Sequence, residues 1–121
     1  MYQQYKDIVA GLESIQFRQQ KVSHDRDQLI GSFDTKLDSL RLPMRLRKRS
    51  GGLLAWRNIA LYGRCQRDTD LIQYRDDLAR LPQTIVQQLL GFEKSRIIVN
   101  ANLSLLQHES HQLKQAIKKS T

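Results

Sequence analysis

The chain has one cysteine, two prolines and no apolar run close to the length of a membrane span. Because Cys65 is alone, no intramolecular disulfide can form, and nothing in the sequence points to an oxidising compartment. The first residues are too polar to begin a secretory signal, and a membrane-spanning helix needs about 20 apolar residues. We therefore expect a cytoplasmic protein that neither enters nor crosses a membrane.

Catalytic and cofactor-binding motifs are also missing. The sequence has no phosphate-cradling glycine loop and no paired-carboxylate motif, and no histidine or aspartate is arranged around Cys65. His108 and His111 share a helix face, but zinc needs three or four ligands, and only His24, across an antiparallel helix pair, is a candidate third ligand. A chain of 121 residues buries a modest core. We expect a non-enzymatic protein without metal, cofactor or small-molecule substrate.

The net charge of +8 is concentrated in one segment. Between positions 41 and 67 there is no aspartate or glutamate, whereas the remaining residues carry twelve basic and twelve acidic side chains. We predict that this segment binds nucleic acid, DNA rather than RNA, through the basic residues Arg41, Arg45, Arg47, Lys48, Arg49, Arg57, Arg64 and Arg67. The alternatives are an anionic membrane, an acidic protein, or a plain surface neutralised by acids from the neighbouring segments.

Two long stretches carry apolar residues at alternating steps of three and four. The first runs from Tyr5 to Leu40 and the second from Ile85 to Ile117, and this spacing predicts long helices over 2–40 and 82–119. Pro82 suits the first turn of the second helix. The weak helix formers at 23–25 and 31–32 leave open a kink or a break in the first helix.

The segment between the two helices is expected to reverse the chain. Met44 to Arg49 alternates apolar and basic residues, and Gly51-Gly52 follows, a pattern that predicts a β-hairpin with Arg45, Arg47 and Arg49 on one face. Met44 and Leu46 then lie on the other face. The predicted fold is mainly α: one domain over 1–121, with two antiparallel stalk helices (1–40, 82–119), a basic hairpin head (41–67) and a short helix (68–81) with Thr69 as its N-cap.

Two aromatic residues lie beside the basic strands. Trp56 and Tyr62 are candidates for base stacking, as in proteins that bind single strands. A lone tryptophan next to Leu53 and Leu54 is more typical of a small core. We therefore favour Trp56 as a core residue whose loss would unfold the head, with stacking as the alternative.

Several residues also carry a resemblance to a known family. Leu54-Ala55-Trp56-Arg57 after a basic, glycine-containing turn, Leu81-Pro82, Arg96-Ile97 and Ser104-Leu105-Leu106, together with Glu93, Asn100 and His108, resemble an uncharacterised family encoded in bacterial integrating conjugative elements. The resemblance covers about 44–112 and leaves the first helix unmatched. It implies a bacterial mobile-element context, in which proteins of DNA transfer and replication are common, and it supplies no mechanism.

The apolar stripe of the second helix is wider than one partner helix can cover. Val86, Leu90, Ile97 and Ile98 widen it, so we expect a homodimer that forms a four-helix bundle, unless the short helix at 68–81 folds back over the stripe. Polar residues within the apolar stripes of the two helices, among them Arg26, Arg96 and Ser110, restrict how the helices align.

Two functions remain: a nucleic-acid-binding accessory protein, or a non-catalytic coiled-coil adaptor whose basic head docks on an acidic protein.

Overall fold

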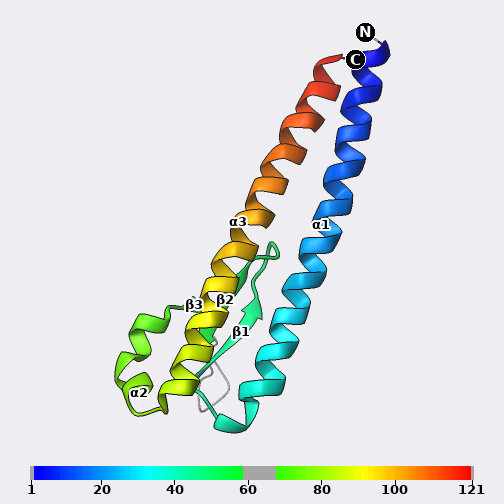
Figure 1. Ribbon diagram of the computed structural model, residues 1–121. Helices are drawn as coiled ribbons and strands as arrows, with labels where there is room; N and C mark the ends of the chain where they lie inside the picture. Colours follow the sequence, from blue (N-terminus) through cyan, green and yellow to red (C-terminus); the bar gives the residue numbers. More distant parts are fainter. Residues whose placement is uncertain (1, 59–67, 121) are drawn as a thin grey trace.

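A computed structural model describes residues 2–58 and 68–120 as two long helices joined by a small sheet (Figure 1). Helix α1 (Tyr2–Leu37) continues into a 3₁₀ turn, η1 (Asp38–Leu40), and helix α3 (Gln83–Ser120) returns beside it in the opposite direction. The two predicted long helices are confirmed. Helix α1 passes through positions 23–25 and 31–32 without a break, and α3 starts after Pro82, whose carbonyl accepts from the amides of Ile85 and Val86.

A three-stranded antiparallel sheet packs against the α1–α3 pair. Its strands β1 (Met44–Lys48), β2 (Leu54–Asn58) and β3 (Asp68–Thr69) follow one another in order, with β1 beside α1 and β2 beside α3 (Figure 1). The predicted hairpin is confirmed, and its turn uses Gly51 and Gly52 at φ angles of +94° and +98°. Strand β3 was not expected, because two residues are too few to show an alternating pattern.

The segment before α3 differs in detail from the predicted short helix over 68–81. Thr69 is not an N-cap: it lies in β3 opposite Trp56, and its hydroxyl bonds to the side chain of Gln73. Helical structure begins later, as a 3₁₀ turn η2 (Leu71–Tyr74) followed by one α-helical turn, α2 (Arg75–Ala79). Asp68 and Thr69 pair with β2 and so are not helical. Local propensity does not predict this pairing, because it is a tertiary contact.

The main core lies where the inner face of the sheet meets the two helices. The alternation of β1 turns Met44 and Leu46 inward, and both are fully buried. The core also contains Leu54 and Trp56 of β2, Phe33 and Leu37 of α1, Leu71 and Tyr74 of η2, and Leu89 and Phe92 of α3. One continuous cluster therefore joins every layer of the fold.

Beyond the hairpin tip the molecule narrows to the α1–α3 pair. Ile15, Leu103 and Leu106 are buried here, as the seam pattern predicted, and Ser110 is the polar residue buried beside them. Gly11 lets the helices approach closely, since an added Cβ would lie 3.2 Å from Leu113 Cδ1. Over the described residues, no helix is long and apolar enough to cross a membrane.

Candidate nucleic-acid interface

Six of the eight basic residues singled out in the sequence lie on or beside the hairpin. Arg45, Arg47 and Lys48 belong to β1, Arg49 follows it, and Arg57 lies on β2, directly opposite Arg45. Arg41 ends η1 in the left-handed region, at φ +52°. We call these six residues the basic surface. The other two, Arg64 and Arg67, and also Tyr62 and Cys65, lie outside the described residues.

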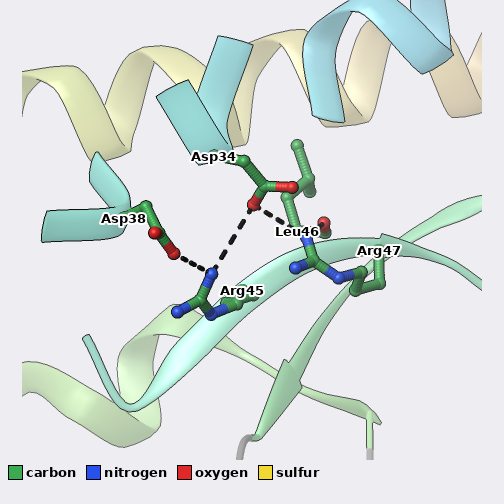
Figure 2. A network of polar contacts seen from close by, with 5 residues as sticks. All are labelled: Asp34, Asp38, Arg45, Leu46 and Arg47. Atoms are coloured by element: carbon green, nitrogen blue, oxygen red, sulfur yellow. Dashed lines mark hydrogen bonds and ion pairs between the residues drawn. The ribbon is translucent and has the colours of Figure 1, made fainter. Parts of the chain in front are cut away.

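The arginines of β1 lie on the face away from the core and turn toward α1. Arg45 donates to Asp38, and its Nη1 lies 3.9 Å from Asp34 Oδ1 (Figure 2). Arg47 donates from Nη1 to the same Asp34 oxygen at 3.0 Å and to the Leu46 carbonyl at 2.7 Å. Asp34 and Asp38 are one helical turn apart, so they present two carboxylates to one strand.

A second acid neutralises the other edge of the hairpin. Asp68 of β3 pairs in register with Arg57, and its carboxylate lies 3.2 Å from Arg49 Nε and 3.8 Å from Arg57 Nη2. The Nε of Arg57 is buried and has no hydrogen-bond partner in the part of the chain that the structure describes. Asp68 thus holds two arginines that come from opposite sides of the turn.

The placement of Arg45, Arg47 and Arg49 on one strand face holds. Arg45, Arg47, Arg49 and Arg57 all pair with aspartates outside the acid-free segment, so acids from the neighbouring segments neutralise part of this surface, as one of the alternatives drawn from the sequence allowed. Six cations against three aspartates leave three positive charges. Within the described ranges, Arg41 and Lys48 have no ion pair and are exposed.

Trp56 belongs to the core, which rules out base stacking by its ring. Only 1% of the residue is exposed, and its ring packs edge-on against Phe33, with centroids 5.5 Å apart. The indole N–H donates to Glu93 of α3. The core interpretation of Trp56 is confirmed, and its fixed orientation anchors β2 on α3.

Glu93 is the acceptor at the centre of this anchor. Arg96 donates to it twice, Nε to Oε2 at 3.0 Å and Nη2 to Oε1 at 2.6 Å, as expected for an i, i+3 pair. These bonds, opposed by partial burial and reinforced by the Trp56 N–H, hold the pKa of Glu93 below its ordinary value. The same pairing raises the pKa of Arg96, so both groups stay charged at neutral pH.

Asn100 makes a second link between β2 and α3. Its Oδ1 accepts from the Leu54 N–H at 2.7 Å and its Nδ2 donates to the Leu54 carbonyl at 2.8 Å. Trp56, Glu93, Arg96 and Asn100, four of the residues that carry the family resemblance, thus all act in attaching β2 to α3. This gives them a structural role in the chain itself.

Sequence reasoning missed three residues of this surface, namely Asp34, Asp38 and Asp68. The spacing of Asp34 and Asp38 on one helix face, directly before a strand that returns along the helix, was the available signal.

His108 and His111 are exposed on α3, and over the ranges 2–58 and 68–120 no three histidine, cysteine or acidic side chains gather to hold a metal. Comparisons with protein-family models, with curated proteins and with solved structures found no match to this chain.

Proposed function

We propose that the basic surface binds nucleic acid through its phosphates. The observation that carries the proposal is the charge of this surface: six cations on one small sheet and its flanks, against three aspartates. Five of the six are arginines, whose planar guanidinium groups bind phosphate oxygens in pairs. The outer face of the sheet presents the partly exposed guanidinium groups of Arg45, Arg47 and Arg57.

The aspartates set the conditions for such binding. A phosphate must compete with Asp34, Asp38 and Asp68 for the arginines that they hold, whereas Arg41 and Lys48 can bind directly. The pairs are partly exposed, with 27% to 52% of each arginine side chain accessible, and ion pairs of this kind contribute about 1 kcal/mol or less. Replacing an aspartate by a phosphate as the partner of an arginine therefore costs little free energy.

The resemblance to mobile-element proteins makes DNA the first nucleic acid to test. We expect the purified chain to bind a fluorescent duplex, with log affinity falling by about 0.9 per phosphate contact as log salt rises between roughly 50 and 300 mM. Replacing Arg45, Arg47 and Arg49 by glutamine should flatten this slope by about two to three. The matched control, with Lys6, Arg18 and Lys114 of the stalk changed to glutamine, should change it far less.

A second variant, Asp68→Asn, is expected to bind nucleic acid more tightly than the wild type. Asp68→Asn keeps the shape of the side chain but releases Arg49 and Arg57, so it should bind more tightly and steepen the slope by up to about two. Circular dichroism must show the same helix content in every variant. Failure of the wild type to bind both DNA and RNA at low salt, or an unchanged slope in the triple variant, contradicts the proposal and favours the adaptor that docks on an acidic protein.

A further inference from the structure

Helix α3 carries large apolar side chains on the face that points away from its own fold. Leu90, Ile97, Ile98 and Leu105 are exposed by 53%, 52%, 60% and 57%, and we call them the apolar stripe. At about 100° per residue these four positions fall within a sector of about 100°, with Ile97 and Ile98 at its two edges. The buried residues Leu89, Phe92, Leu103 and Leu106 occupy the opposite side, where α3 meets the sheet and α1.

The chain does not cover this stripe with its own short helical segment. Residues 71–79 were the candidate cover, but Leu71 and Tyr74 point into the main core, and Ile72 is itself 74% exposed. All four stripe residues stay more than half exposed. Four large apolar side chains exposed on one side of a helix are typical of an association surface, since exposed apolar residues are usually scattered singly.

The spacing of the stripe is symmetric about its midpoint. Its positions, 90, 97, 98 and 105, read the same from either end, with the centre between Ile97 and Ile98. A twofold contact between identical helices requires such self-complementarity, because each residue meets a symmetry-related position on the other copy. A different protein as partner would place no such requirement on the sequence.

We propose that the apolar stripe binds a second copy of this chain, with the two α3 helices antiparallel about a twofold axis between Ile97 and Ile98. Leu90 then packs against Leu105 of the partner subunit, and Ile97 and Ile98 lie at the axis, each beside its own copy. The proposal does not depend on the function of the basic surface. A dimer presents that surface twice on one particle, which raises the affinity for any long polyanion.

Charge favours the antiparallel arrangement over a parallel one. The same face of α3 carries the exposed residues Lys94 and Ala101, which are also symmetric about the midpoint. In the antiparallel pair each Lys94 lies opposite a small Ala101, and the two lysines are about 10 Å apart along the helix axis. A parallel pair would set the two lysines side by side and align the helix dipoles.

Sedimentation equilibrium of the full chain at about 5 to 100 µM tests the dimer. We expect the wild type to dimerise and Ile98→Glu to weaken the dimer by about 30-fold or more, as for a central interface residue. The matched control is Phe17→Glu, which changes a side chain that is 70% exposed on α1 and lies outside the stripe. A monomeric wild type, or equal weakening by both variants, overturns the proposal.

Cysteine cross-linking tests the axis. In a Cys65→Ser background, Ile98→Cys lies next to its own copy and should form a disulfide-linked dimer. Leu90→Cys lies about 22 Å from its own copy along the helix, so alone it should not cross-link, and the same holds for Leu105→Cys. A mixture of the Leu90→Cys and Leu105→Cys proteins should cross-link. Efficient self-linking of Leu90→Cys indicates a parallel pair and contradicts the proposed axis.

Discussion

The side-chain amide of Asn100 completes the hydrogen bonding of β2 beyond the end of β3. Within the described ranges, strand β3 pairs with Trp56 and Arg57, and Asn100 supplies the donor and the acceptor that Leu54 would otherwise find in a longer strand. Because Leu54 is 1% exposed, water is a poor substitute for these two bonds. The side chain of one α3 residue therefore makes the two hydrogen bonds that a neighbouring strand would make with Leu54.

Asn100→Ala should destabilise the fold by roughly 2 kcal/mol or more, since it leaves both backbone groups of Leu54 without partners. The check is urea unfolding together with amide hydrogen exchange, in which the Leu54 N–H should lose protection. Asn102→Ala is the matched control on the exposed side of the same helix, and higher helix propensity should make it neutral or slightly stabilising. Equal effects of the two variants would contradict the assigned role of Asn100.

Glu93 should make stability depend on pH in the acid range. Its pKa in the folded state lies below the ordinary value of 4.5, so the ionised carboxylate stabilises the fold above pH 4.5. This contribution is lost as the pH falls through the folded-state pKa. Glu93→Gln should cost about 1 to 2 kcal/mol at neutral pH, and the difference from the wild type should shrink below pH 4.5.

Urea unfolding of both proteins between about pH 3 and 7 measures that difference. Glu13→Gln, at an exposed position of α1, is the control and should stay within about 0.5 kcal/mol of the wild type. A difference between wild type and Glu93→Gln that is constant over the whole range would show that the ionised carboxylate does not stabilise β2 on α3.

At the scale of elements, the hairpin is attached to both helices rather than standing free as a head. Its tip touches α1, where Arg26 Nη1 donates to the Gly52 carbonyl at 2.9 Å, and β2 is joined to α3 through Glu93 and Asn100. Arg26 was expected to restrict helix alignment from the seam. It instead reaches the turn, and this contact positions the hairpin along the stalk.

The two turn glycines provide a matched pair for testing this contact. Both have positive φ, so alanine at either position should cost about 1 to 2 kcal/mol. A Cβ at Gly51 meets nothing within 4 Å, whereas one at Gly52 lies 3.1 Å from Arg26 Nη1, so Gly52→Ala should cost more. In an Arg26→Met background the two costs should become equal. Urea unfolding of the four glycine variants and their two parents measures this coupling.

At the scale of the whole molecule, two surfaces of different chemistry face outward from one core. The basic surface lies on the sheet, and the apolar stripe lies on the exposed side of α3. The core cluster includes residues of α1, β1, β2, η2 and α3, so a change at either surface can be made without opening the core. The proposed DNA binding and the proposed dimer can therefore be tested separately with exposed substitutions.

The sequence by itself determined the two long helices, the hairpin and the inward face of β1. These follow from local periodicity: apolar spacing of three and four gives α1 and α3, and alternation in Met44–Lys48 buries Met44 and Leu46. The turn at Gly51-Gly52 was also predictable from local sequence, because glycine adopts positive φ angles without steric cost. Burial of Trp56 followed from its apolar neighbours.

Only the tertiary structure decided which aspartates pair with the arginines of the basic surface. Asp34 and Asp38 precede the acid-free segment and Asp68 follows it, and they meet the arginines because the chain folds back on α1 and because β3 joins the sheet. The role of Asn100 and the start of helix at Leu71 rather than Thr69 depend on contacts between distant segments in the same way. Periodicity reports which face of an element is buried, but pairing across elements depends on register, and register is set by the packed core.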